Sequence, residues 1–530
     1  MSDRTSPPTL LTNGQIWTGD RHVDAMAIRD CRVVAAGSPD EARVALGPGF
    51  DVVDLVGRRA IPGLIDSHVH ILRAGLTWNH ITSWDDVGSL QDGLAAISRD
   101  AASRPAEAWV RVLGGWHPGI FPERRGPTRA ELDEAANGHP AYVQLLYEDG
   151  VLNSRGLELL LAGGDVPGVE RADDGSPTGR VTGPIAFGRV AALFEKPSSA
   201  DREASTKAVM ADFNARGLTG AIDPGGFGID QRSYDTMFDM WRRDEMTVRT
   251  RLYLVPQTRG NEVAEIREWV RNVQPRYGDD MLRYVGMGEI LTFGCHDMEG
   301  VRPFEVSDQA RSELLEISDL LARHNWPVHM HAIFDTTISA VLDTWEEVDR
   351  RHGMAGRRWS LGHAEPISRK SLERVKTLDM GIAIQNRLMF RSADSTALWG
   401  EEVGHNSPPL GDILDMGIPL GGGTDATVVS PFDPWRSIWW LVTGKSVDGA
   451  PPRAGRHRLS IEQALTAYTR GSAWFSFDEG NRGHLEPGAL ADLAVLDQDP
   501  FEIESDELPS VGADLTMVGG GIVHTTGEIG

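Results

Sequence analysis

The chain has 530 residues, of which 40% are hydrophobic and 24% are charged, a composition typical of folded globular proteins rather than disordered ones. Its 77 acidic residues outnumber its 52 basic residues, and the formal net charge is −25. This charge argues against nucleic acid and anionic membranes as partners, because both require a basic surface. The length corresponds to one barrel-sized unit with a smaller one, or to three ordinary domains.

The cysteine content and the N-terminal segment bear on the cellular compartment. The two cysteines, Cys31 and Cys295, exclude a disulfide scaffold and fit a reducing environment. The N-terminal segment has no basic region followed by a long apolar core, so we expect no signal peptide. No apolar run approaches the roughly 18 residues of a membrane-spanning helix. The sequence therefore predicts a cytoplasmic protein with no membrane partner.

Both ends of the chain have the pattern of short β-strands. Apolar runs alternate with polar residues and are separated by turns, for example around Asn13–Gly14 and Asp30–Cys31, which is a signal for strands and hairpins. The same pattern returns near the C-terminus. We expect residues 1–60 and 480–530 to pack together as one small composite β-sandwich.

The middle of the chain, residues 61–479, alternates short apolar runs with amphipathic helical stretches, which is typical of βα units around a parallel sheet. A closed parallel barrel has eight strands, whereas nine runs qualify here. We assign the run at 140–147 to an insertion after the first strand, at about residues 75–168, because that stretch is rich in Trp, Pro and Gly. The eight barrel strands are then expected within 60–70, 218–223, 248–255, 283–291, 326–331, 358–363, 381–386 and 417–423.

Side chains that can bind a metal ion follow several of these strands. His68 and His70 are two residues apart in an extended segment, so both imidazoles face the same side. Active sites of parallel barrels form at the carboxyl ends of the strands, and neutral imidazoles bind zinc and similar ions. One such residue has the ordinary interpretation of a helix cap, but five strand ends together favour a metal centre. The candidate ligands are His68, His70, Glu289, His331, His363 and Asp425, with His329 as an alternative to His331.

Two motifs resemble a known family. IPGLIDSHVH resembles the first-strand motif P-G-x-I-D-x-H-x-H of the metal-dependent amidohydrolase superfamily, and EPGALADLAVLD resembles its G-x-x-A-D-x-x-V-x-D signature. VHMHAIFDTTISAVLD, LGHAEPIS and NSRGLELL are similar to the subgroup of YtcJ-like and N-substituted-formamide-deformylase-like amidohydrolases. The resemblance implies a (β/α)8 TIM barrel with a composite β-sandwich. It also implies metal ligands after strands one, four, five, six and eight, where the strand count independently places the candidates.

The sequence departs from the family at two positions. Many members bridge two metal ions with a carboxylated lysine on strand four, but none of the five lysines lies there, and Glu289 takes that place. We expect Glu289 to be a ligand, with a hydrogen-bonding role as the alternative. The subgroup also tends to have a histidine five residues before Asn153–Ser154, where this chain has Glu148. The implied cofactor is one or two divalent metal ions, with zinc favoured and manganese or iron as alternatives.

The predicted reaction is metal-dependent hydrolysis of a carbon–nitrogen bond of amide type, N-acyl or N-formyl, in a small molecule. A divalent ion lowers the pKa of a bound water, and Asp425 would accept the water's proton and deliver it to the leaving amine. His296 is a candidate donor to the oxyanion, and Arg387 is a candidate partner for a substrate carboxylate. Packing or a solvated loop is the ordinary alternative for each. The full set of candidate substrate contacts is Trp116, Tyr147, Glu148, His296, Asn386 and Arg387.

Other functions fit the same residues less well. Ring deaminases of this family usually have a glutamate three residues after the strand-five histidine, where this chain has Phe334. Hydrolysis of an ester or lactone remains an alternative on the same site. A non-catalytic binding barrel is the least supported, because every expected ligand position holds a competent residue. We expect a small-molecule substrate and, by analogy with the family, a homodimer.

Overall fold

The centre of the molecule is a barrel of eight parallel strands. The computed structural model describes residues 7–147, 149–229, 231–298 and 304–529. Backbone hydrogen bonds from Ser67 to Gly422 (3.0 Å) and from Asp425 to His68 (2.8 Å) join the segments that follow the first and last strands and close the barrel. In spatial order, which is also chain order, the strands are β8 (Leu64–Asp66), β14 (Leu218–Asp223), β15 (Arg249–Leu254), β16 (Leu282–Glu289), β17 (Val328–Ala332), β18 (Ser360–His363), β19 (Gly381–Gln385) and β20 (Leu420–Gly423).

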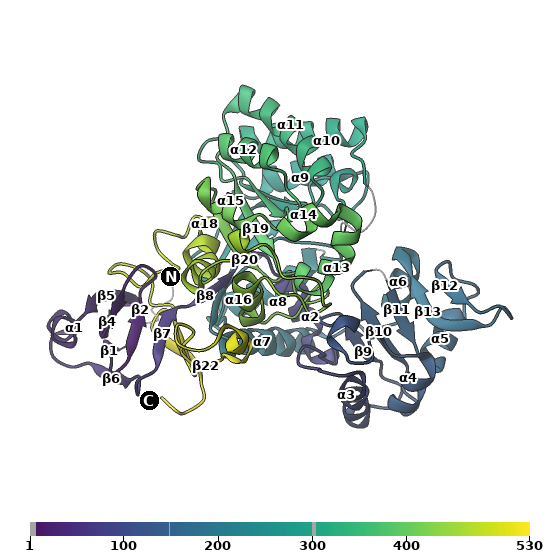
Figure 1. Ribbon diagram of the computed structural model, residues 1–530, viewed down its shortest axis with the longest axis horizontal. Helices are drawn as coiled ribbons and strands as arrows, with labels where there is room; N and C mark the ends of the chain where they lie inside the picture. The colour runs from purple at the N-terminus through teal and green to yellow at the C-terminus, as the bar shows by residue number, and fades with distance from the viewer. Residues whose placement is uncertain (1–6, 148, 230, 299–303, 530) are drawn as a thin grey trace.

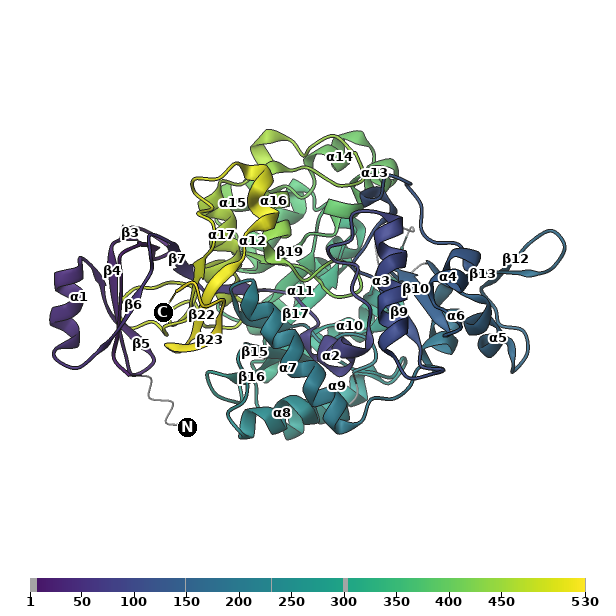
Figure 2. The same cartoon turned by 90° about the horizontal axis from the view of Figure 1, so that it is seen from below.

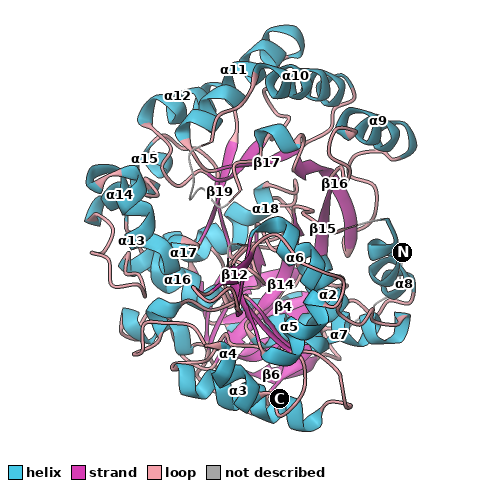
Figure 3. Cartoon of the chain, turned by 90° about the vertical axis from the view of Figure 1, so that its right-hand side faces the viewer, coloured by secondary structure: helices cyan, strands magenta, loops and turns pink. Residues whose placement is uncertain are grey.

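A ring of helices covers the outside of the barrel (Figure 3). The helix Asp308–Arg323 shows how the sequence builds them: the Ser307 side chain accepts a hydrogen bond from the backbone of Ala310 and caps the helix, while Leu314, Ile317 and Leu321 are buried. The main ring helices are α7 (Ser199–Ala215), α8 (Asp235–Arg242), α9 (Glu262–Asn272), α10 (Asp308–Arg323), α11 (Asp335–His352), α12 (Arg369–Thr377), α13 (Leu388–Trp399), α14 (Glu401–Asn406), α15 (Leu410–Asp415), α16 (Pro434–Thr443) and α17 (Ile461–Thr466). The predicted (β/α)8 fold is confirmed.

Strands from the two ends of the chain share a sheet beside the barrel (Figures 1 and 2). The C-terminal strand β21 (Leu493–Leu496) pairs antiparallel with the N-terminal strand β7 (Arg59–Pro62), and β7 leads directly into the first barrel strand. This sheet has the order β23 (Gly521–Thr525), β22 (Ala513–Val518), β21, β7, β2 (Gln15–Trp17), β3 (His22–Val23). The second sheet has the order β5 (Arg32–Gly37), β4 (Ala25–Arg29), β1 (Thr9–Thr12), β6 (Asp51–Asp54), and α1 (Pro39–Leu46) packs on it.

The two sheets share one hydrophobic core, to which both ends of the chain contribute. Leu11 and Ile28 come from the first sheet, and Val495 and Leu515 come from the second. A sandwich built from both termini is therefore present, as the pattern of short strands indicated. The exact boundaries at residues 60 and 480 stay predictions.

The insertion after the first barrel strand forms a unit of its own, on the side of the barrel away from the sandwich (Figure 1). The run at 140–147, which the strand count excluded from the barrel, contributes β10 here. The insertion's sheet continues past Gly168, beyond the predicted end of the insertion, because the strand Pro177–Thr182 pairs with Asp149–Leu152 and the strand Val169–Arg171 pairs with Pro177–Thr182. Its sheet has the order β12 (Val169–Arg171), β13 (Pro177–Thr182), β11 (Asp149–Leu152), β10 (Ala141–Leu145), β9 (Val110–Leu113), with helices α3 (Leu90–Ser103), α4 (Arg129–Ala135), α5 (Ser154–Leu161) and α6 (Gly183–Ala191).

The amino-terminal end of the barrel contains a buried network of arginines and aspartates. Arg249 lies 2.7 Å from Asp492, and Arg251 lies 2.7 Å from Asp478. Arg482 bonds to Asp492 at 3.2 Å. Because a buried charge is costly without a partner, these ion pairs hold the C-terminal segment against the barrel floor. Asp492 belongs to the C-terminal signature motif, so this residue of the motif has a role in the fold.

Two further features concern the compartment. No helix within the described ranges is long and apolar enough to cross a membrane. Cys31 and Cys295 do not form a disulfide, and Cys295 is buried against the backbone of Ala310 on α10.

Candidate metal centre

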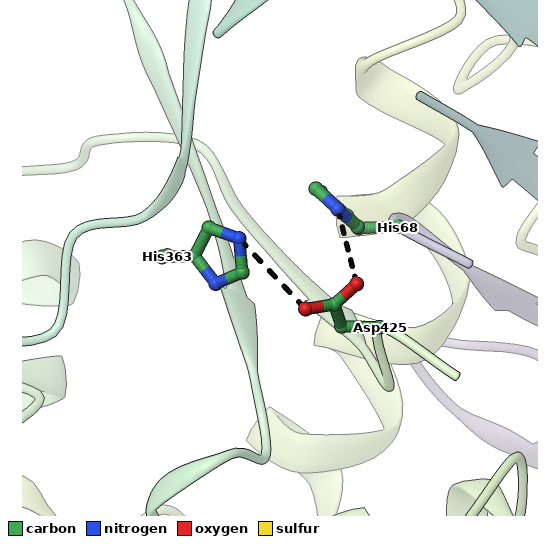
Figure 4. A group of neighbouring side chains, drawn as sticks. All are labelled: His68, His363 and Asp425. Atoms are coloured by element: carbon green, nitrogen blue, oxygen red, sulfur yellow. Dashed lines mark ion pairs between the residues drawn. The ribbon is translucent and has the colours of Figure 1, made fainter. Parts of the chain in front are cut away.

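The six candidate ligands meet at the carboxyl end of the barrel. None exposes more than 5% of its surface. Within each of three overlapping groups, the ligand atoms lie within 4.8 Å of one another. Figure 4 shows one group, in which Asp425 lies between the imidazoles of His68 and His363. The groups are His68, His363 and Asp425; His68, His70 and Glu289; and Glu289, His331 and His363.

The two carboxylates connect these groups. Oε2 of Glu289 lies 3.3 Å from Nε2 of His68 and 3.9 Å from Nδ1 of His331, while its Oε1 lies 3.8 Å from Nε2 of His70. Asp425 approaches the same His70 nitrogen at 3.0 Å through Oδ1. Glu289 therefore stands between the groups, at the place where the family's bridging lysine was expected.

Three histidine nitrogens at this end of the barrel lack a hydrogen-bond partner among the described residues. Nε2 of His68 and both ring nitrogens of His363 are buried without a hydrogen-bond partner in the described parts of the chain. A buried polar atom without a partner carries a desolvation penalty. A divalent cation would remove that penalty, and a set of imidazole nitrogens and carboxylate oxygens is a suitable donor set. The residues present thus fit a metal ion.

The protonation states of Glu289 and His363 favour the same interpretation, whereas at His70 and His331, whose pKa values are raised, an ion would have to displace a proton. Burial alone would raise the pKa of Glu289, but His70, His68 and His331 outweigh it and hold that pKa well below its usual range. Burial, together with the neighbouring histidines, lowers the pKa of His363 well below its usual range. The centre therefore offers an anionic oxygen donor and a neutral nitrogen donor at neutral pH.

A relay of hydrogen bonds fixes which nitrogen of His68 faces the centre. Nδ1 of His68 lies 2.9 Å from Nε2 of His329, and Nδ1 of His329 lies 2.8 Å from the hydroxyl of Ser360. That hydroxyl donates to the carbonyl of Val328, so it accepts from His329, whose Nε2 then accepts from Nδ1–H of His68. This arrangement leaves Nε2 of His68 as a lone-pair donor directed at the centre.

His329 is consequently a supporting residue in this geometry and not one of the clustered groups. It faces the barrel interior like His331, but it lies one layer deeper, because residues two apart on a strand are about 6.6 Å apart. His70 is oriented in a similar way: its Nδ1 lies 2.6 Å from the carbonyl of Gly225, which leaves Nε2 to face Glu289 and Asp425.

Asp297, which the sequence analysis did not select, orients His331. Its Oδ1 lies 3.0 Å from Nε2 of His331, and the carboxylate also accepts the backbone N–H groups of Ile333 and Phe334. Burial lowers the pKa of His331, but the hydrogen bond and charge of Asp297 outweigh it and raise the pKa to about 9. The bond to Asp297 leaves Nδ1 of His331 to face Glu289, which is the carboxylate–histidine arrangement of many metal sites.

Two of the candidate ligands have unusual backbone conformations. His363 has φ of 72° and Asp425 has φ of 56°, which is the left-handed region that residues other than glycine rarely adopt. Their backbones are held in place by hydrogen bonds: the N–H of His363 donates to the side chain of Gln385 (2.7 Å), and that of Asp425 donates to the carbonyl of His68 (2.8 Å). Such strained residues persist where the surroundings over-determine them, and they cluster at functional sites.

Two of the predicted substrate contacts line the small cavity in front of the candidate ligands. This cavity has a volume of about 30 Å³. Tyr147 reaches it from the insertion, and His296 lies over His331 with the two rings stacked 4.0 Å apart. Burial, followed by the neighbouring His331, lowers the pKa of His296 to about 3. Glu148 lies outside the described residues.

The other predicted contacts are placed elsewhere by the structure. Trp116 lies in the core of the insertion, stacked on Phe121, and its indole N–H donates to the backbone of Gln144. Its large apolar ring is buried in that core, and Trp116 is not among the residues that line the cavity. Arg387 is fully buried and pairs with Glu365 at 3.1 Å, behind His363.

Asn386, at the end of β19, is also fully buried, and its amide atoms have no hydrogen-bond partner among the described residues. It does not line the cavity. The predicted roles of Trp116, Asn386 and Arg387 in contacting substrate are therefore not supported by their positions.

The sequence analysis missed one charged residue of the cavity. Arg73 lines the cavity beside Tyr147. It is three residues after His70, and residues three apart share a helix face, so its position on α2 (Ile71–Thr77) was a usable signal. The apolar part of the wall comes from Phe227, Met298, Ile333 and Val429.

Comparison with known protein families identifies the family of this chain. The model of the amidohydrolase family matches residues 51–524. The chain belongs to the amidohydrolase family. It is accordingly an enzyme, a hydrolase of carbon–nitrogen bonds other than peptide bonds.

Individual relatives of this amidohydrolase cover nearly its whole length. N-substituted formamide deformylase of Arthrobacter pascens is 24% identical over 96% of this chain and 97% of its own. The putative amidohydrolase YtcJ of Bacillus subtilis is 24% identical over 96% of each chain. The predicted resemblance to this subgroup is confirmed. Among solved structures, an uncharacterized metal-dependent hydrolase from Pyrococcus horikoshii has a TM-score of 0.68 and 21% identity, over 94% of this chain and 99% of its own.

Proposed function

We propose that this amidohydrolase cleaves an amide-type bond, N-acyl or N-formyl, in a small molecule, using one or two divalent metal ions held by His68, His70, Glu289, His331, His363 and Asp425. The observation that carries the proposal is the set of buried histidine nitrogens without partners, gathered around Glu289 at the end of the barrel where active sites form. The name of the deformylase relative supports the N-formyl class. When bound, the ion supplies a water of lowered pKa and polarises a substrate carbonyl.

Asp425 is the proposed general base. It lines the cavity, and its Oδ1 lies 3.0 Å from Nε2 of His70. The carboxylate therefore borders both the other proposed ligands and the space for the substrate. There it would accept a proton from the attacking water and return it to the leaving nitrogen, which must be protonated before the carbon–nitrogen bond breaks.

His296 is the proposed donor to the oxyanion. With its pKa lowered to about 3 it is neutral at pH 7, and its Nδ1 accepts the backbone N–H of Met298 at 3.1 Å. In a neutral imidazole the other nitrogen then carries the hydrogen. The ring therefore presents an Nε2–H donor at the cavity, which is the kind of group that stabilises a developing negative charge.

Zinc is the favoured ion because the site combines several imidazoles with carboxylates, and manganese and iron remain alternatives. Glu289 would bridge two ions, since its Oε1 approaches His70 and its Oε2 approaches His331, which belong to different groups. A cytoplasmic location, supported by two cysteines that do not form a disulfide, and a homodimer stay predictions.

A hydrolysis screen tests the proposed reaction. The metal-loaded protein is offered N-formyl amines, N-acyl amines, cyclic amides and esters at pH 7.5, and the released carboxylic acid is measured for every class. We expect turnover of the first two classes, and loss of that turnover in Asp425→Asn. Near-full turnover in Asp425→Asn with metal still bound would show that the general base is another group, and turnover of esters alone would replace the amide by an ester substrate.

A further inference from the structure

Arg73 has an unusual setting inside the cavity. Its Nε and Nη2 are buried and have no hydrogen-bond partner in the described parts of the chain. The guanidinium carbon lies 5.8 Å from the ring centre of Tyr147, a contact that orients a cation with a modest free-energy gain. These two nitrogens are adjacent donors on one edge of the guanidinium, the arrangement that binds both oxygens of a carboxylate.

Several acidic groups act on Arg73, but among the described residues none of them forms a hydrogen bond to its Nε or Nη2. Its electrostatic partners are Tyr147, Asp425, Glu289 and Asp223. Asp425 and Glu289 are among the proposed metal ligands, and one divalent ion offsets both of their charges. Asp223 accepts the backbone N–H groups of Leu72 and Gly225 at 2.8 and 2.9 Å. With an ion bound to Asp425 and Glu289, the carboxylate that is left among these partners is Asp223, which is outside the cavity lining, so the guanidinium would face the cavity as a positive group.

Apart from the proposed metal centre and its ligands, the described wall has no second strongly basic side chain. Arg73 is the only arginine or lysine among the described residues that line this cavity. Arg387, the arginine that the sequence suggested for this task, is paired with Glu365 behind His363. The rest of the wall is apolar or belongs to the proposed ligands and His296.

We infer that Arg73 binds a carboxylate of the substrate, so that the preferred substrates are small N-formyl or N-acyl amides that carry a carboxylate. The inference rests on the hydrolase function proposed above and names its substrate class. The carboxylate belongs either to the amine part or to the acyl part of the amide, and the two cases are separated by the choice of substrates.

Paired substrates that differ only in charge test the inference. N-formylglycine against N-formylglycinamide places the carboxylate on the amine side, and N-methylsuccinamate against N,N′-dimethylsuccinamide places it on the acyl side. For at least one pair we expect the metal-loaded wild type to prefer the anionic member. Arg73→Gln is expected to lower kcat/KM for that member about 100-fold, the effect of losing two charge-assisted hydrogen bonds, and to change the neutral member less than about threefold. Arg73→Lys is expected to fall between the two.

A matched control separates local binding from general loss of charge. Arg259 follows β15 at the same end of the barrel, is exposed, and lies over the ring of Phe293 rather than at the cavity. Arg259→Gln is expected to leave both members of each pair unchanged. Equal losses for the anionic and neutral members in Arg73→Gln would overturn the inference, because Arg73 would then act on the reaction or the fold.

Calorimetric binding decides the inference independently of turnover. The metal-loaded wild type and Arg73→Gln are titrated with N-formylglycine, N-methylsuccinamate and their neutral counterparts. Binding of a carboxylate compound that weakens at least tenfold in Arg73→Gln supports the inference even if none of the compounds is hydrolysed, in which case only the proposed reaction fails. Equal binding of both carboxylate compounds by both proteins, as expected if they bound the metal alone, would overturn it.

Discussion

The two ends of the barrel both bury charged side chains, but they balance those charges differently. At the amino end, the guanidinium groups of Arg249, Arg251 and Arg482 each have an aspartate within 3.2 Å. At the carboxyl end, nitrogens of His68 and His363 have no protein partner in the described residues. At the first end each guanidinium has its own carboxylate, and of this network only Nη2 of Arg482 lacks a hydrogen-bond partner in the described residues, whereas the second end gathers imidazoles and carboxylates around a space that a cation fits. A buried charged cluster therefore indicates a functional site when unpartnered donor atoms converge on one point.

The largest expected effect comes from removing a proposed ligand. His363→Asn is expected to lower kcat/KM by about 10⁴-fold, because the loss of metal removes several kcal/mol of transition-state stabilisation, while the unfolding transition shifts little. Metal content by mass spectrometry and turnover of the best substrate check this. His352, a surface histidine paired with Asp319, gives the control His352→Asn, and equal activity of both variants would contradict the assignment.

At the amino end we expect a loss of stability without a loss of activity. Asp492→Asn leaves Arg249 and Arg482 without their shared anion, which should lower the free energy of unfolding by about 4 kcal/mol, while the folded fraction keeps its metal and its turnover per bound ion. Urea denaturation followed by tryptophan fluorescence gives the stability. An unchanged denaturation midpoint would mean that this network does not hold the barrel and the C-terminal segment together.

A smaller effect is expected from removing a residue that hydrogen-bonds to a proposed ligand. His329→Phe removes the acceptor of Nδ1–H of His68 and should weaken metal affinity about 10- to 100-fold, as is typical for outer-shell partners of metal-bound histidines. Competition with a chromogenic chelator measures the affinity. Unchanged affinity would show that His68 is oriented without the relay, whereas complete loss of metal would make His329 a ligand itself.

The carboxyl end could be located from the sequence, because its ligands end a strand or follow it within four residues, and the strands are counted by their apolar runs. The residues that hydrogen-bond to the ligands and orient them could not be located in this way. Asp297 comes from the loop after β16 and meets His331 from 34 positions away, and no periodicity links two such residues. Arg387 followed the seventh strand as expected, but its partner Glu365 is set by packing between neighbouring strands. Trp116 was an ambiguous aromatic residue of the insertion, and only the insertion's own core explains its position.

The smallest expected effect is the pH dependence of the stability that the amino-end ion pairs contribute. Burial raises the pKa of Asp492, but Arg249 and Arg482 outweigh it and hold the pKa below its usual range. A depressed pKa stabilises the fold above the unfolded value of about 4, and this contribution is lost as the pH falls through the folded pKa. The stability difference between wild type and Asp492→Asn should therefore be constant from pH 7 to about pH 4 and shrink below it. A difference that stays constant to pH 2.5 would exclude the ion pairs as its cause.

The central claim is that the carboxyl end of the barrel is a divalent-metal centre. Its most direct test is to measure the metal content of the purified protein and then to titrate the chelated protein with zinc and manganese, following both binding and amide hydrolysis. We predict one to two equivalents bound and activity that returns in proportion to them. A protein that holds far less than one equivalent, and that added zinc or manganese neither binds nor activates, would contradict the account.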